Sequence, residues 1–146
     1  MQRHIQTIFC DDIRHELGGK VSFIGVYSAR LIVPAFPVTL PKLCVAVNAV
    51  TPAAQPFERL TLRVLKDDEL LFEAVFDEKQ LAETVESAVD ENQNHHDSVL
   101  ALGAHVVMSP FQIGGPCRLR VRAETEEGEL RGLSLIVEQA QAGGAQ

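Results

Sequence analysis

The side chains best suited to chemistry lie in two short clusters of the sequence. Two aspartates, a histidine and a glutamate fall within Asp11–Glu16, and the second cluster is His95–Asp97. Carboxylates and imidazoles bind zinc and other divalent ions, so the clusters would form a mixed oxygen and nitrogen site if they met. No familiar ligand spacing supports this, and the neighbours Asp11 and Asp12 would point to opposite faces of a strand. We predict no metal and no other cofactor.

Hydrolytic chemistry has less support still. Serines, histidines and aspartates are present, but no serine lies in a Gly-x-Ser-x-Gly elbow. The run Gly18–Ser22 resembles a phosphate loop superficially, yet it lacks the spaced first glycine and the Lys-Ser/Thr pair. We predict no catalytic residue. A metal-dependent or hydrolytic enzyme that uses the Asp11–Glu16 turn is the alternative hypothesis.

The same turn is a candidate binding site. Asp11, Asp12, Arg14 and Lys20 gather both signs of charge around it. A structural interpretation has equal support, because carboxylates beside a tight turn accept backbone N–H bonds and Arg14 can bridge to one of them. The sequence leaves the two interpretations open.

A second candidate binding site is the alternating row Arg118, Arg120 and Arg122. Alternate residues of a strand share one face, so the three guanidiniums form a cationic stripe. The stripe would dock a carboxylate-rich partner or the chain's own acidic segment, residues 77–97. The competing interpretation is a solvated outer face whose charges discourage aggregation at a sheet edge.

Hydrophobic patterns predict the strands that position these candidates. Residues 5–13 and 21–27 flank a Gly-Gly turn at Leu17–Lys20, which is typical of a hairpin. The prolines of Val33–Pro41 indicate an extended edge or crossover segment. Leu43–Val50 follows as a short buried strand.

The next hairpin joins Leu60–Lys66 to Leu70–Phe76 through a three-residue loop. This loop length sets Arg63 opposite Glu73 and keeps the apolar residues on one face, as in the pair Val64 and Phe72. A two-residue loop would place charged residues opposite apolar ones.

A short helix follows the second hairpin. Asp77 and Gln80 have the spacing of a capping box, and Leu81, Val85 and Val89 form one apolar stripe. The polar run that follows the helix, residues 90–97, is expected to be a surface loop.

The remaining strands are residues 99–108 and a last hairpin, Cys117–Thr125 with Glu129–Glu138. A three-residue loop with Gly128 at its end predicts three pairs. These pairs are Val121 with Leu133, Leu119 with Leu135, and Cys117 with Val137.

Together these elements predict an all-β fold with one short helix. Strands joined by hairpins, without alternating helices, favour an antiparallel immunoglobulin-like β-sandwich of seven or eight strands. The length of 146 residues fits one domain, which we place at residues 1–139, with a frayed tail over 140–146.

Charge and cysteine content limit the function classes. Residues 77–97 hold seven acids and one lysine, a charge of −6 out of the total of −7. Nucleic-acid binding is disfavoured, because it needs a contiguous basic face. Three scattered cysteines, no signal-peptide pattern and no long apolar run predict a cytoplasmic protein that does not enter membranes.

Two segments resemble an uncharacterised family of small bacterial proteins. They are the opening, Cys10–Asp12 with Gly18–Tyr27, and the ending, Gly114–Arg122 with Gly128 and Leu133–Val137. The ending is also similar to the closing hairpin of many immunoglobulin-like domains, which often carry an aromatic residue where this chain has Cys117. The resemblance implies a sandwich and carries no activity and no catalytic residue.

The leading functional hypothesis is therefore a non-catalytic cytoplasmic module that binds a protein partner or has a structural role. Self-association through an exposed sheet edge or apolar face is also expected to be possible.

Overall fold

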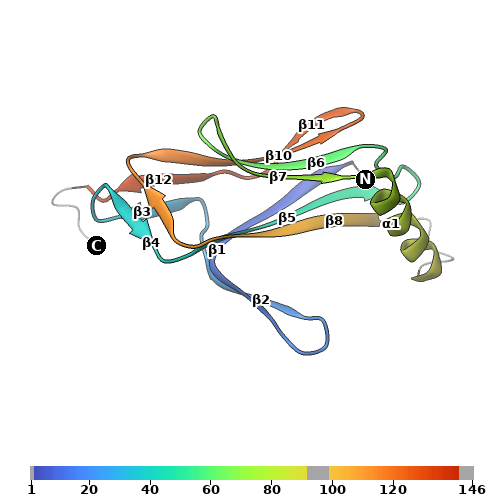
Figure 1. Cartoon of the computed structure of the whole chain (residues 1–146), viewed down its shortest axis with the longest axis horizontal. Helices are drawn as coiled ribbons and strands as arrows, with labels where there is room; N and C mark the ends of the chain where they lie inside the picture. Colours follow the sequence, from blue (N-terminus) through green and yellow to red (C-terminus); the bar gives the residue numbers. More distant parts are fainter. Residues whose placement is uncertain (1, 92–98, 142–146) are drawn as a thin grey trace.

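The computed structural model of the chain describes residues 2–91 and 99–141 and consists mainly of strands. Two β-sheets lie one over the other, and α1 (Glu78–Glu91) sits at one end of them (Figure 1). No helix in this described part is long and apolar enough to cross a membrane.

The first sheet joins three strands from the start of the chain to one later strand. Its order is β2-β1-β5-β8, and all its neighbouring pairs are antiparallel. The strands are β1 (His4–His15), β2 (Val21–Val26), β5 (Leu43–Pro52) and β8 (Val99–Met108). The turn between β1 and β2 has Gly18 and Gly19 at positive φ, as its sequence predicts.

The second sheet has the order β3-β12-β10-β6-β7, and β11 also pairs with β10. Its strands are β3 (Arg30–Val33), β6 (Leu60–Lys66), β7 (Glu69–Phe76), β10 (Cys117–Thr125), β11 (Gly128–Arg131) and β12 (Leu135–Gln139). A separate pair joins β4 (Val38–Leu40) to β9 (Phe111–Ile113), which gives the proline-rich segment the extended edge position expected of it.

The predicted β-rich fold with one helix is confirmed, but the prediction of an antiparallel fold with seven or eight strands differs from the structure in two respects. Twelve strands lie within the described residues, because several are pieces of only three or four residues. In addition, β3 runs parallel to β12, with Leu31 beside Val137, so the second sheet is mixed. Parallel partners are joined by long crossovers and leave no hairpin signal in the local sequence.

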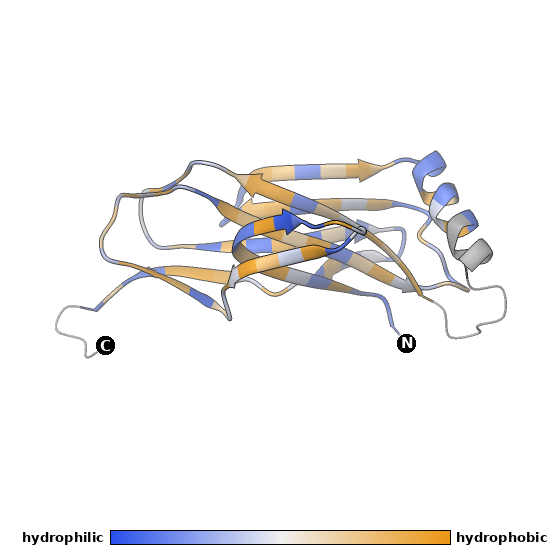
Figure 2. Ribbon diagram, turned by 90° about the horizontal axis from the view of Figure 1, so that it is seen from below, coloured by the Kyte–Doolittle hydropathy of each residue, from blue (hydrophilic) through white to orange (hydrophobic). Residues whose placement is uncertain are grey.

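One cluster of buried apolar side chains fills the space between the sheets. Val45 and Val47 of the first sheet and Leu62, Leu119 and Leu135 of the second belong to it. Apolar segments recur along the strands of both sheets (Figure 2). Burial of each such side chain contributes about 1.5–3 kcal/mol to folding, so this cluster holds the layers together.

The predicted register of β6 and β7 is confirmed, although the loop is built differently. Val64 pairs with Phe72 and Arg63 with Glu73. The loop contains two residues, Asp67 and Asp68, and a bulge between Val64 and Leu65 supplies the extra residue. Asp67 has φ 53°, a left-handed conformation that Asp tolerates. The loop is one residue shorter than predicted and the bulge adds one residue. The side chains of β6 and β7 beyond the bulge therefore lie on the predicted faces of the sheet.

The last hairpin is confirmed only at its far end. Leu119 pairs with Leu135 and Cys117 with Val137, but β11 ends at Arg131 and the predicted partner Leu133 is exposed. Thr125 pairs with Gly128, so the loop has two residues instead of three. The break between β11 and β12 shifts the pairing with β10 by one residue, so that β12 has the register predicted for it.

The helix begins with the predicted capping box. The Gln80 backbone N–H donates to Asp77 Oδ1 at 2.8 Å, and the Asp77 backbone N–H donates to Gln80 Oε1 at 2.9 Å. Leu81 is buried against the core, as the apolar stripe predicts. The expected polar loop lies largely outside the described residues, as does most of the expected tail. Ala140, at the start of that tail, donates its N–H to Val33 O.

Candidate functional site

The hairpin of β1 and β2 extends beyond the first sheet. β1 pairs with β5 only over His4–Cys10, so residues 12–15 pair with β2 alone. We call residues 11–25 the arm; in Figure 1 it leaves the layers and projects from one side of them. Four of the predicted site residues, Asp11, Asp12, Arg14 and Lys20, belong to the arm.

The carboxylates at the base of the arm have partners within the chain. Asp11 accepts a hydrogen bond of 2.5 Å from the Tyr27 hydroxyl. Asp12 accepts from Lys42 Nζ at 3.1 Å and from the Ile13 N–H at 3.0 Å, and lies 3.7 Å from Arg14. The bond from Lys42 holds the pKa of Asp12 below its ordinary value. This geometry favours the structural interpretation of the two acids, and their binding role stays a prediction.

Gly25 permits the close approach of the two strands at the base of the arm. Its φ is +69°, and a Cβ there would overlap the carboxylate of Asp11. The glycine of the Phe-Ile-Gly-Val-Tyr run therefore makes room for the contact between Asp11 and Tyr27.

Tyr27 reports directly on this contact, because it is the only tyrosine and the chain has no tryptophan. Burial, and then the hydrogen bond and negative charge of Asp11, raise the pKa of Tyr27 to about 12. We expect ultraviolet titration of the tyrosinate to show this value, and Asp11→Asn to lower it. Asp12→Asn is the matched control and should leave it unchanged. Titration of the native protein near the ordinary tyrosine pKa would contradict the contact.

The arm also folds back over the outer face of the first sheet. The His15 ring lies 5.4 Å from the His105 ring of β8, and the edge of Phe23 lies 6.2 Å from the same ring, both measured between centroids. The partner of His15 is therefore His105, whereas His95–Asp97 lies outside the described residues. Within residues 2–91 and 99–141, no three potential metal ligands come together.

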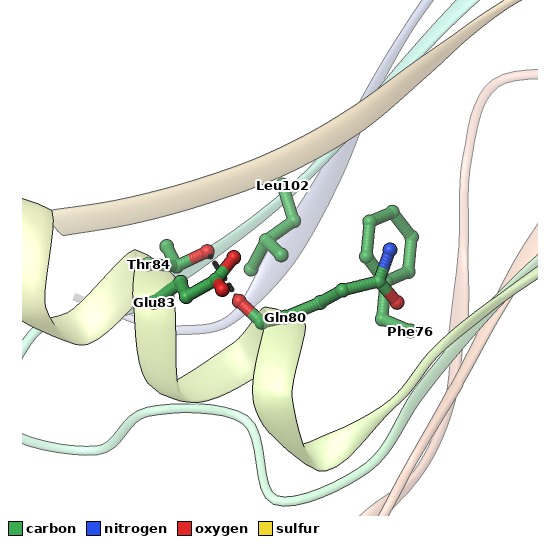
Figure 3. Close-up of a pocket in the computed structure, with 5 residues that line it drawn as sticks. All are labelled: Phe76, Gln80, Glu83, Thr84 and Leu102. Carbon is green, nitrogen blue, oxygen red and sulfur yellow. Dashed lines mark hydrogen bonds between the residues drawn. The ribbon is translucent and has the colours of Figure 1, made fainter.

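An enzyme at the arm would need a pocket there. Four pockets lined by described residues have volumes of about 270–350 Å³, and none of these four includes a residue between 11 and 20. Figure 3 shows one of them, between α1 and the strands, where the Thr84 hydroxyl donates to Gln80 O at 3.0 Å. Its only ionisable lining residue is Glu83, which gives it no pair of groups for acid–base chemistry.

The predicted arginine row lies on the outer face of β10 and is part of a larger group. Arg122 pairs with Arg63 on β6 and with Arg131 on β11, so these guanidiniums share one face with Arg118 and Arg120. We call these five residues the arginine face. Four of them line a depression of about 310 Å³, together with Leu65, Asp67, Asp68 and Glu129. The depression is therefore lined by four arginines and three acids.

Neighbouring glutamates neutralise part of the arginine face. Arg63 donates to Glu73 and to Glu124, each at 2.8 Å, which confirms the predicted pair of Arg63 with Glu73. Burial, followed by the repulsion of Arg131, lowers the pKa of Arg122. Within the described residues, Arg118 and Arg120 form no ion pair. Of these two, Arg120 lines the depression, and Arg118 lies two residues before it on the same strand.

The sequence did not identify Arg131 as a member of this face. With the assumed three-residue loop, Arg131 is not opposite Arg122. The observed two-residue loop is the signal that would have found it, since the pair Thr125 and Gly128 places Arg131 beside Arg122.

Comparison with protein families matches residues 6–138 to the family described as "Family of unknown function (DUF6941)". Comparison with curated proteins finds no match.

Proposed function

The chain belongs to the DUF6941 family of unknown function, and we propose that it is a non-catalytic module that binds an acidic protein segment on the arginine face. The observation that carries the proposal is the depression lined by four arginines, in which Arg120 has no ion pair within the described residues. Planar guanidiniums bind carboxylates through paired, charge-assisted hydrogen bonds. Glutamate and aspartate side chains of a partner therefore suit this face.

A partner protein is a better occupant than the chain's own acidic segment. The described part of α1 packs near β8 and Phe57, at the end of the layers. No ion pair joins this part of α1 to the arginine face. The face also contains Glu124 and Glu129. These acids would repel a continuous polyanion more than a protein segment whose acidic residues are separated by other residues.

The proposal includes an immunoglobulin-like architecture and a cytoplasmic location in bacteria. The order β12-β10-β6-β7 supports the first, because it follows the G-F-C-C′ arrangement of such domains. Three free, buried cysteines support a reducing compartment. Burial raises the pKa of each thiol, as expected for cysteines that pack as small apolar side chains.

The test is titration of the protein with a fluorescent peptide rich in Asp and Glu, followed by anisotropy at low and at physiological salt. We expect saturable binding that weakens as salt rises, because exposed charge pairs are screened. The double variant Arg118→Gln/Arg120→Gln should lose about tenfold or more in affinity, since a hydrogen bond to a charged group contributes about 1.5–3 kcal/mol.

The matched control is Arg14→Gln/Lys20→Gln, which removes the same charge from exposed positions of the arm, on the other sheet. Its affinity should stay close to that of the native protein. Equal losses in the two double variants would show that the peptide responds to net charge only, and the proposal would then be wrong. Absence of binding at low salt would contradict it as well.

A further inference from the structure

We infer that Cys10 and Cys44 are a redox-sensitive pair, which forms a reversible disulfide with a small disulfide oxidant and thereby releases the base of the arm. Oxidised glutathione represents this class of oxidant. The inference is independent of the arginine face, which lies on the other sheet.

The two cysteines lie opposite each other on neighbouring strands. Cys10 of β1 is the register partner of Cys44 of β5, and opposed residues of an antiparallel pair have their side chains on the same face. Their chain neighbours Phe9 and Val45 belong to the core cluster, so both thiols lie on the outer face of the first sheet. The third cysteine, Cys117, lies on the second sheet.

The backbone geometry of the pair suits a disulfide that forms and breaks. The carbonyl oxygen of Phe9 accepts a hydrogen bond from the Tyr27 N–H, on the side of β2. The backbone groups of the next residue, Cys10, therefore point towards β5 and make Cys10 and Cys44 a hydrogen-bonded pair. The Cα atoms of such a pair are about 5.5 Å apart, as in many disulfides.

The Cβ atoms of the same pair are farther apart than a relaxed disulfide requires. Hydrogen-bonded pairs have Cβ separations of about 5.5 Å, whereas disulfides have about 3.8 Å. The bond would draw the two strands together and would be strained. Strained disulfides are readily reduced, which is the property of a regulatory bond.

The base of the arm covers both thiols. Cys10 and Cys44 are 0% exposed, although they lie on the outer face. Cys10 Sγ donates to the carbonyl oxygen of Asp12 at 3.4 Å, and Cys44 Sγ donates to that of Asp11 at 3.9 Å. A disulfide carries no S–H group, so its formation removes both of these bonds to the arm. The contact between Asp11 and Tyr27 lies directly beside this change.

Local opening of the arm gives the oxidant access. Burial protects both thiols while the arm is closed. Residues 12–15 pair with β2 alone, so the arm can lift while the paired strands of the body stay folded. The rate of oxidation is then set by how often the arm opens.

The reaction is an ordinary thiol–disulfide exchange in two steps. The thiolate of one cysteine attacks a sulfur of oxidised glutathione and expels one glutathione thiolate. The thiolate of the other cysteine attacks the protein sulfur of this mixed disulfide and expels the second glutathione thiolate. Two protein thiols are thereby oxidised, one glutathione disulfide is reduced, and the two protons pass to the expelled thiolates.

The test is incubation of the full chain with oxidised glutathione, followed by alkylation in denaturant and mass spectrometry. We expect one alkylated cysteine in the oxidised chain and three in the untreated chain. Trypsin should then release residues 4–14 and 43–59 joined by a disulfide. Reduced glutathione should restore all three thiols.

The matched variants are Cys44→Ala and Cys117→Ala, each of which replaces a buried thiol with a small apolar side chain. Cys117→Ala should form the same disulfide, whereas Cys44→Ala should form only mixed disulfides with glutathione. Melting temperatures of both variants verify that they are folded. Alkylation of all three cysteines in the oxidant-treated native chain would overturn the inference, and so would a disulfide that includes Cys117.

Titration of Tyr27 tests the release of the arm. After removal of the oxidant, the pKa of Tyr27 should fall from about 12 in the reduced chain towards the ordinary value of about 10 in the disulfide form. Cys117→Ala should show the same shift. An unchanged pKa in a chain that carries the disulfide between Cys10 and Cys44 would show that the bond does not release the arm.

Discussion

Replacing Arg3 with Met is expected to lower the free energy of unfolding by about 3 kcal/mol or more, although Arg3 lies near the chain end. Its side chain is only 8% exposed and pairs with both Glu126 and Glu127. Removal of the buried Arg3 guanidinium leaves Glu126, which is 22% exposed, without its partner, whereas Glu127 is 54% exposed and keeps much of its hydration.

The other contacts of Arg3 explain the size of this effect. Nε donates to Thr51 Oγ1 at 2.9 Å, and Nη2 donates to the carbonyl oxygens of Gln55 and Pro56 at 3.0 and 3.1 Å. The guanidinium lies 4.7 Å from the centre of the Phe57 ring. Arg3 therefore joins the start of β1 to the loop after β5 and to the turn between β10 and β11.

Denaturant unfolding measures the loss, with Arg59→Met as the control. Arg59 is exposed, and among the described residues its side chain has one ion pair, with Glu124 at 3.5 Å, and donates to Thr125 O at 3.2 Å. Its replacement should change stability by less than about 1 kcal/mol. A loss below about 1 kcal/mol for Arg3→Met would show that the network contributes little.

The difference in unfolding free energy between the native protein and Arg3→Met should become smaller as the solution is acidified. Burial alone would raise the pKa of Glu126, but hydrogen bonds from the Glu58 N–H and from Arg3 outweigh it and hold the pKa below the ordinary 4.5. Because the folded pKa is depressed, this contribution to stability is present above pH 4.5 and is lost as the pH falls through the folded value.

Gly103→Ala is expected to destabilise the chain by about 1–3 kcal/mol, the usual cost of overpacking. Gly103 lies on β8 opposite Asn48 of β5. A Cβ at Gly103 would overlap Asn48 Oδ1 and the backbone oxygen of Val47. The Asn48 side chain can rotate away, whereas the Val47 carbonyl moves only if the two strands separate.

Thermal unfolding, with Gly114→Ala as the control, measures this effect. A Cβ at Gly114 would have open space around it, and no positive φ opposes the substitution. Adding Asn48→Ala to Gly103→Ala should recover only part of the loss, because the clash with Val47 remains. Full recovery would show that the side chain alone limits this position.

The sequence predicted contacts between elements that are close together in the chain. Arg63 and Glu73 are opposed because charge and apolar alternation both require it, and the bulge in β7 preserves that alternation. The capping box of α1 is likewise a local pattern. The parallel partner of β3 is about a hundred residues away, so no local pattern could indicate it.

The candidate sites were likewise predictable where a local sequence pattern marks them, and were not predictable where distant segments meet. The row of arginines on β10 is a period-two pattern and was predictable, whereas Arg131 joined it through a turn of unexpected length. The hairpin of the arm was also predictable. Its departure from the sheet was not, because it depends on β5 beginning at Leu43, too late to pair with residues 12–15. Arg3 had no pattern to mark it, since its partners come from three other segments.

The arm contributes no residue to the described core, in which Phe9 is followed along the chain by Leu31. Substitutions at exposed positions of the arm, such as Leu17 with its 93% exposure, therefore cost no interior packing. Gly25 is the exception, because a Cβ there would overlap Asp11.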